Sequence, residues 1–187
     1  MEESTQNQSE TTSLYQHAVR WGLIAGVISV MLTIIYYVID VGLMVNWKVG
    51  LLTFAIYIGF AIYAGIQYRG IAGGFLSYGK AFQHGLILFA ISALVSTAFN
   101  LVLYSVIDPE LPSKLTDAAL EQTEAMLRGF GTPEDAIEKA MDESRVKMAD
   151  QFSAMGMIKS YLWVLIGCAV LALITSLFVR KNEPVDM

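Results

Sequence analysis

The fold of this chain is decided near its N-terminal end, where residues 18–39 read AVRWGLIAGVISVMLTIIYYVI. The one ionisable residue in this stretch is Arg20, which lies at its edge. A helix of this length rises about 33 Å, enough to cross the hydrocarbon core of a bilayer. A soluble core would scatter its apolar residues at helical or strand period, whereas this run is continuous, so the stretch predicts a transmembrane helix.

Three further runs of the same kind follow along the chain. Residues 49–66 contain no charge, residues 81–107 contain only His84 near their start, and residues 157–179 contain only Lys159 near theirs. Charged groups close to the end of a span can reach the membrane interface, so they do not oppose insertion. The whole chain is 55% hydrophobic and 16% charged. We therefore predict an all-α membrane protein with four transmembrane helices, the first three within residues 18–107.

The segment between the third and fourth spans, residues 108–156, is charged and predicts a helical hairpin outside the membrane. Its first helix is expected over about 113–128, before the stretch Gly129-Phe130-Gly131. Glycines adopt the left-handed conformation that ends helices, so the first helix should stop there. The second helix is expected over about 133–155, because Pro133 suits the first helical position.

One face of this second helix is apolar. Its five apolar residues recur at intervals of four, seven, four and three, which keeps them on one side of the helix: Ile137, Met141, Met148, Phe152 and Met155. The stripe can be buried between the two helices of the hairpin. It can also serve as a contact surface, because methionine-rich faces adapt to varied partners.

The two ends of the chain are short and polar. Residues 1–17 are acidic and are expected to lack regular structure, while residues 180–187 form a brief tail. No basic stretch precedes a short apolar core, so a cleaved signal peptide is not expected. Basic residues number five on the side of the ends and seven on the other side. The compact pair Arg180 and Lys181 favours cytoplasmic ends and a periplasmic 108–156 loop.

Two of the spans carry small and polar residues on one helical face. On the first span these are Gly22, Gly26, Ser29, Thr33 and Asp40, and on the third they are Ala81, Gly85, Ser92, Ser96 and Asn100. Small residues let helices approach closely, so we interpret both stripes as helix-packing faces. The alternative is a polar pathway. Coupling to protons or ions would need an ionisable group well inside a span, and no clear example is present.

A glycine-rich connection, GIAGGFLSYGK at residues 70–80, opens the third span. It lacks the spacing and the preceding strand of a phosphate-binding loop, so no nucleotide site is expected. Lys80 and His84 share a helical face, where two potential cations at a helix start oppose its dipole. They can simply extend to the membrane interface, or they can bind an anionic headgroup or an acidic residue such as Glu183. The candidate functional residues are Asp40, Gly73, Gly74, Tyr78, Gly79, Lys80, His84 and Asn100.

The sequence contains no pattern typical of catalysis. Histidine, cysteine and acidic residues do not cluster with metal-ligand spacing, and no nucleophile motif is present. We therefore expect no enzyme activity, no cofactor, no metal and no nucleic-acid partner.

The order of these features resembles a group of bacterial membrane proteins known as the domain of unknown function 4199 family. The resemblance covers most of the chain. It rests on three features: the pair of spans ahead of Arg69, the stretch from Gly73-Gly74-Phe75 to Ser77-Tyr78-Gly79-Lys80-Ala81-Phe82, and the exit Asp108-Pro109. It implies a source in the Bacteroidota and a place in the inner membrane, and it implies no activity.

From these features we expect a non-enzymatic structural or interaction protein. Its hairpin or its helix faces would contact itself or another membrane protein, in addition to the lipid bilayer. The alternative hypothesis is a small transporter or channel subunit with a polar path along the first and third spans.

Overall fold

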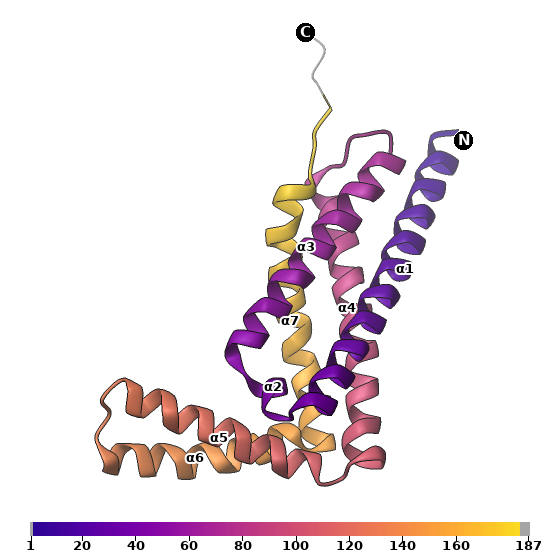
Figure 1. Cartoon of the computed structure of the whole chain (residues 1–187). Coiled ribbons are helices and arrows are strands. Elements are labelled where there is room, and N and C mark those ends of the chain that lie inside the picture. The colour runs from indigo at the N-terminus through magenta and orange to yellow at the C-terminus, as the bar shows by residue number, and fades with distance from the viewer. Residues whose placement is uncertain (1, 184–187) are drawn as a thin grey trace. The chain divides into compact units, whose positions relative to one another are not determined.

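The computed structural model describes residues 2–183, with side chains from Ser13 onward, and nearly all of these residues are helical (Figure 1). The elements are α1 (Glu2–Ile39), α2 (Gly42–Val45), α3 (Trp47–Ile71), α4 (Tyr78–Val102), the π-helical turn η1 (Leu103–Ile107), α5 (Leu111–Gly129), α6 (Glu134–Phe152) and α7 (Ala154–Val179). Four helical stretches are long and apolar enough to cross a membrane: Ser13–Ile39, Trp47–Ile71, Tyr78–Ile107 and Ala154–Val179. The predicted all-α fold with four candidate spans is confirmed.

The start of the first helix differs from the expectation. Helix α1 begins at Glu2, so the expected lack of regular structure before residue 18 does not hold for the helical residues 13–17. Leu14 is buried there in a cluster with Tyr68 and Val179. The physical reason is that Leu14 continues the face of Ala18 and Ala25, so the apolar side of the span extends one turn further towards the N-terminus.

The chain divides into two compact units. Unit 1 comprises residues 1–29, 54–96 and 163–187, and unit 2 comprises residues 30–53 and 97–162. Segments of α1, α3, α4 and α7 share one core in unit 1, made of Ala25, Ala61, Ala64, Leu88, Phe89, Cys168 and Ala172. Most of these side chains are small, so the four helical segments approach one another closely.

Helix α1 meets α4 at two glycines. A Cβ atom added to Gly22 would lie 2.9 Å from the carbonyl oxygen of Leu88, and one added to Gly26 would lie 2.7 Å from Cβ of Val95. Both distances are too short for a real side chain, so the two helices can approach this closely only because these residues are glycine. Gly85, which belongs to the predicted packing face of the third span, lies against α7 and not against α1. A Cβ added there would lie 3.5 Å from Cβ of Ala172 and 3.5 Å from Oγ1 of Thr175.

Unit 2 is built around the paired helices α5 and α6, which lie side by side and run in opposite directions (Figure 1). Their buried residues include Leu111, Leu115 and Leu120 of α5 and Ile137 of α6. Leu111 and Leu115 also form a cluster with Leu103, against which several half-buried side chains pack, among them Tyr37, Met44, Phe99 and Phe152. The apolar stripes of the hairpin are therefore used largely within the unit.

The glycine contact can be tested with two matched substitutions in unit 1. We expect Gly26→Ala to lower the free energy of unfolding by about 1–3 kcal/mol, because its new methyl group overlaps Val95. Gly59→Ala adds the same methyl group where no atom lies within 4 Å, so it should leave stability unchanged or raise it by up to about 1 kcal/mol through helix propensity. Thermal unfolding in detergent measures both, and equal effects of the two substitutions would contradict the contact.

Candidate functional site

A pair of histidines is the most unusual buried feature of unit 1. Nδ1 of His17 in α1 lies 2.9 Å from Nε2 of His84 in α4, within hydrogen-bonding distance. His84 is only 1% exposed. A neutral imidazole has one nitrogen that donates and one that accepts, so one ring of the pair donates to the other. One nitrogen of each imidazole is thus paired with the other ring, whereas Nε2 of His17 is buried and has no hydrogen-bond partner among the described residues.

Two aromatic rings complete what we call the histidine site, formed by His17, Trp21, Tyr68 and His84. The ring of Tyr68 in α3 stacks on that of His84, with centroids 5.3 Å apart and planes inclined by 16°. His17 lies against Tyr68 at 5.3 Å and against Trp21 at 6.0 Å. Residues from α1, α3 and α4 therefore meet at one place, and the aromatic faces shield the imidazoles from the surrounding lipid phase.

The sequence identified only part of this site. His84 was a candidate because it shares a face with Lys80, yet the structure turns His84 inward to His17 while Lys80 is exposed. His17 was missed because it fell within the expected tail. The signal that could have revealed it is its spacing of four residues from Trp21 and eight from Ala25, which places it on the buried face of α1.

A second polar network in unit 1 joins α1, α3 and α4. The hydroxyl of Tyr57 donates to the carbonyl of Ala25 at 2.8 Å, and Ser92 donates to the Tyr57 hydroxyl at 3.2 Å. Ser96 donates to the backbone carbonyl of Ser92 at 3.0 Å, so its hydroxyl is satisfied within its own helix. Ser92 thus acts in helix packing through a hydrogen bond between helices.

Leu88 separates the two polar regions of unit 1. It is completely buried and lies one turn after His84 and one turn before Ser92. A cavity of about 40 Å³ beside Tyr57 has an apolar lining that includes Ala25 and Phe60. A space of this size holds little more than a single water, and an apolar site offers it no partners. In the part of the chain that the structure describes, Leu88 thus lies between the histidine pair and the hydrogen bonds of Ser92.

The remaining sequence candidates fall at different places. Asp40 is exposed, and its carboxylate accepts the N–H of Gly42 at 2.8 Å, a local turn contact. Asn100 is half-buried, and its Oδ1 has no hydrogen-bond partner among the described residues. Ser29 and Thr33 are half-buried on α1.

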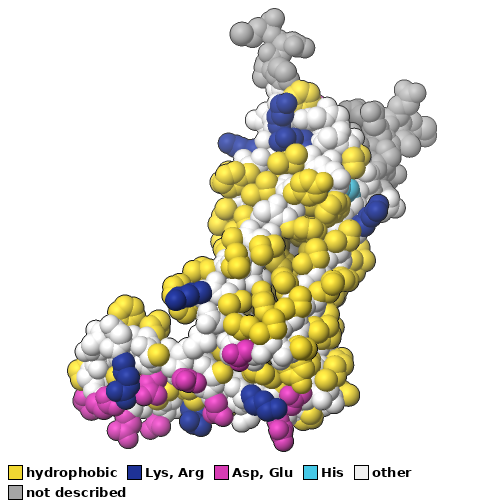
Figure 2. Space-filling model, viewed as in Figure 1, with side chains coloured by type: hydrophobic (Ala, Val, Ile, Leu, Met, Phe, Trp, Pro, Cys, Tyr) yellow, Lys and Arg dark blue, Asp and Glu magenta, His cyan; other side chains and the backbone are white. Residues whose placement is uncertain are grey.

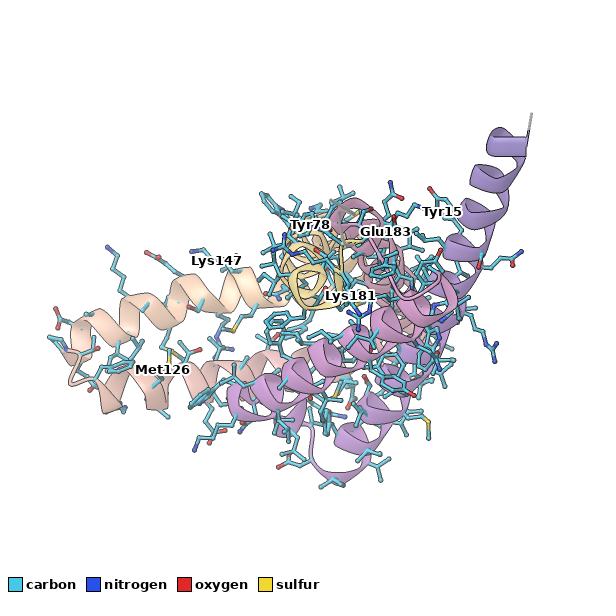
Figure 3. The ribbon with its side chains drawn as sticks, turned by 90° about the horizontal axis from the view of Figure 1, so that it is seen from above. Tyr15, Tyr78, Met126, Lys147, Lys181 and Glu183 are labelled. Carbon is cyan, nitrogen blue, oxygen red and sulfur yellow. The ribbon has the colours of Figure 1, made fainter. Side chains whose placement is uncertain are left out.

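In the connection between α3 and α4, the glycines and Tyr78 have separate roles. Gly73 and Gly74 have positive φ angles of 86° and 89°, as their turn requires. The hydroxyl of Tyr78, a residue labelled in Figure 3, donates to the carbonyl of Leu173 in α7 at 3.1 Å. Gly79 has neither a positive φ nor a close neighbour.

Asp108 organises the start of the hairpin in unit 2. Its carboxylate accepts hydrogen bonds from the Tyr37 hydroxyl at 3.1 Å, from Nζ of Lys114 at 3.2 Å and from the N–H of Glu110 at 3.1 Å. Burial opposes ionisation of this carboxyl, but the bonds from Lys114 and Tyr37 outweigh burial and hold the pKa of Asp108 below its usual value. The same contact raises the pKa of Lys114. Sequence analysis had treated Asp108 only as part of a chain exit.

The apolar stripe of α6 is mostly not a free surface. Ile137 is 3% exposed, Met141 and Met148 are half-buried, and Phe152 packs against the Leu103 cluster. Met155 was expected on the same helix, but α6 ends at Phe152 and Met155 is exposed in α7. The burial of Ile137 and the packing of Phe152 agree with the first of the two interpretations, in which the stripe is buried within the hairpin, because two polar helices remain paired by burying their apolar sides. A contact role for Met141, Met148 and Met155 stays a prediction.

Exposed apolar side chains gather instead at the end of α5. We call Met126 and Phe130 the hairpin tip, and Figure 3 labels Met126 on α5. They are 52% and 77% exposed. Among the described residues, no group of three or more His, Cys, Asp or Glu side chains could hold a metal ion.

Comparison with known proteins agrees with the resemblance noted in the sequence. A family model described as protein of unknown function (DUF4199) matches residues 20–181. That match includes Arg69, the glycine-rich connection and Asp108, on which the resemblance rests. Searches of curated proteins and of solved structures found no match.

A double-mutant cycle tests the histidine contact. We expect His17→Ala and His84→Ala each to destabilise the protein by about 1–3 kcal/mol, because each leaves a buried ring nitrogen without its partner. The double variant should cost less than the sum, with a coupling energy of about 0.5–3 kcal/mol. Thermal unfolding in detergent measures the cycle. The exposed neighbours Gln16 and Gln83, changed to Ala in the same way, should be additive, and additivity at the histidines would disprove the contact.

The Asp108 contact predicts a pH dependence with a definite sign. Because the pKa of Asp108 is lower in the folded state than in the unfolded state, its contribution to stability is present above the unfolded value and is lost as the pH falls through the folded value. Thermal unfolding followed from about pH 7 to about pH 3 should show a smaller acid loss for Asp108→Asn than for the wild type. An unchanged pH profile in this variant would mean that the carboxylate is not engaged as described.

Proposed function

The chain belongs to the DUF4199 family of proteins of unknown function, and we propose that it is a non-enzymatic inner-membrane protein that binds another protein through its hairpin tip. The observation that carries this proposal is the exposure of Phe130, 77%, in a segment too polar to lie within the bilayer. Its ends would lie in the cytoplasm and its hairpin in the periplasm, in keeping with the compact pair Arg180 and Lys181 after the last span.

The tip is held in place by ion pairs. Nε of Arg128 donates to Glu124 at 3.0 Å within α5, and Nη1 of Arg128 donates to Glu134 at the start of α6 at 3.1 Å. Gly131, with a φ of 72°, allows the chain to turn between the two helices. Phe130 is thus presented on a turn that is already ordered, and a preorganised aromatic side chain binds a partner at a smaller entropic cost.

The hairpin does not need its tip for its own packing. Its buried seam is supplied by other residues, chiefly Leu111, Leu115 and Ile137. An aromatic ring that the fold does not bury, at the end of a water-facing element, is a common anchor for protein recognition.

The charge of the hairpin indicates the chemistry of the partner. Residues 111–152 contain nine acidic and five basic residues, and Figure 2 shows acidic side chains along this pair of helices. Like charges would repel a second copy of the hairpin and the anionic surface of a membrane. The best fit is a protein with an apolar pocket for Phe130 and basic residues around it.

The alternative, a small transporter or channel subunit, has less support. The polar residues on α4 that suggested a pathway, such as Ser92 and Ser96, bond to neighbouring helices or to their own backbone. Leu88 lies between them and the histidine site.

Site-specific cross-linking in native membranes tests the proposed contact. A photoreactive amino acid placed at Phe130 should form one discrete protein adduct, whereas the same amino acid at the exposed Lys139 should not. With the photoreactive group at Met126 instead, the additional substitution Phe130→Ser should reduce the adduct formed from position 126 about fivefold. That factor is the effect of losing roughly 1 kcal/mol of apolar contact. Adducts with lipid alone, or equal adducts from both positions, would overturn the proposal.

A further inference from the structure

The turn between α3 and α4, residues 72–77, contains two glycines, so part of its backbone is not covered by side chains. No atom lies within 4 Å of a Cβ added at Gly73, Gly74 or Gly79. Gly73 and Gly74 both have positive φ angles, and the N–H of Gly74 donates to the carbonyl of Arg69 at 2.9 Å. Backbone N–H groups in such turns are suited to bind anions.

The end of α7 places a cation beside this turn. The backbone of Lys181 pairs with that of Leu76 through two hydrogen bonds, of 2.8 and 2.9 Å, and Leu76 is buried. The ammonium group of Lys181 lies 5.4 Å from the centroid of the Phe75 ring, a cation–π distance. The backbone pairing therefore keeps the charge of Lys181 next to the exposed turn, and Figure 3 labels this residue.

The surroundings of the turn are strongly cationic. From Ser13 onward, the described residues of unit 1 include five basic side chains, Arg20, Arg69, Lys80, Arg180 and Lys181, and a single acid, Glu183; Glu2, Glu3 and Glu10 lie nearer the start of α1. Figure 2 shows dark blue side chains gathered at one end of this unit. Nη1 of Arg69 donates a hydrogen bond to the carbonyl of Val179 at 2.9 Å, whereas Arg180 and Lys181 are exposed. These two exposed cations favour an anionic ligand.

We propose that this turn, together with Arg180 and Lys181, binds the phosphate of an anionic phospholipid headgroup. A lipid fits better than a soluble phosphate because the turn follows directly on a candidate span. Ile71 at the end of α3 and Phe178 near the end of α7 are both exposed, and they can contact acyl chains while the headgroup lies at the turn. Cations at such a border attract anionic headgroups.

Native mass spectrometry of the full-length protein in detergent tests this site. The probe is an equimolar mixture of phosphatidylglycerol and phosphatidylethanolamine with identical acyl chains. The wild type should retain the anionic lipid preferentially. The double variant Arg180→Gln with Lys181→Gln should reduce that preference by about fivefold for each cation removed. The matched control, Lys139→Gln with Lys147→Gln, removes two exposed cations from α6 and should leave the preference unchanged.

A second variant keeps the test independent of folding. Gly79→Asp adds a carboxylate in open space within the first turn of α4, where an acid favours the helix, so it should abolish the preference without lowering thermal stability. Inorganic phosphate, added at the lipid concentration against a chloride control, should not displace phosphatidylglycerol. Equal retention of the two lipids by the wild type, an unchanged preference in both site variants, or displacement by free phosphate would overturn the proposal.

Discussion

The close contact between α1 and α4 at Gly22 and Gly26 is the constraint on which unit 1 depends. Because neither residue has a side chain, the backbone of α1 reaches Leu88 and Val95 directly. That approach also accompanies the hydrogen bond between His17 of α1 and His84 of α4. In lipid, where apolar burial does not drive helices together, such packing and such hydrogen bonds supply the specificity of association. A bulkier residue at Gly26 would therefore disturb polar contacts as well as packing.

The two units present different chemistry to their surroundings. Unit 1 has a cationic turn and a buried histidine pair, whereas unit 2 has an acidic hairpin whose tip carries an exposed aromatic ring. Each charge pattern selects a class of ligand: anions for the turn, and a basic protein surface for the hairpin. The two proposals made above rest on separate residues, and each is tested by variants that leave the other surface intact.

Sequence reasoning succeeded where one local property decides the structure. Uncharged runs long enough to cross a bilayer identified four candidate spans, and the glycines near residue 130 marked the turn between α5 and α6. Sequence reasoning failed where the role of a residue depends on a contact with another helix. His17 was assigned to a tail because the residues before it are polar, and the neighbouring Tyr68 and His84 explain why it is half-buried on a helix there. The role of Asp108 likewise depends on Tyr37, 71 positions earlier in the sequence.

By itself, the sequence determined that this chain has four apolar helices and a polar helical hairpin, because the transfer of residues into lipid depends on composition and length alone. It also indicated that another helix can approach the first span closely at Gly22 and Gly26. The tertiary structure decided which helix each face meets, and so assigned the stripe of Ile137 and Phe152 to packing and left Phe130 exposed. It also paired Lys181 with Leu76 to place a cation at the glycine turn. The physical reason is that an apolar face of a helix can be buried by any complementary neighbour, and a polar face can form hydrogen bonds with any complementary neighbour. Only the packed chain determines which neighbour each face contacts.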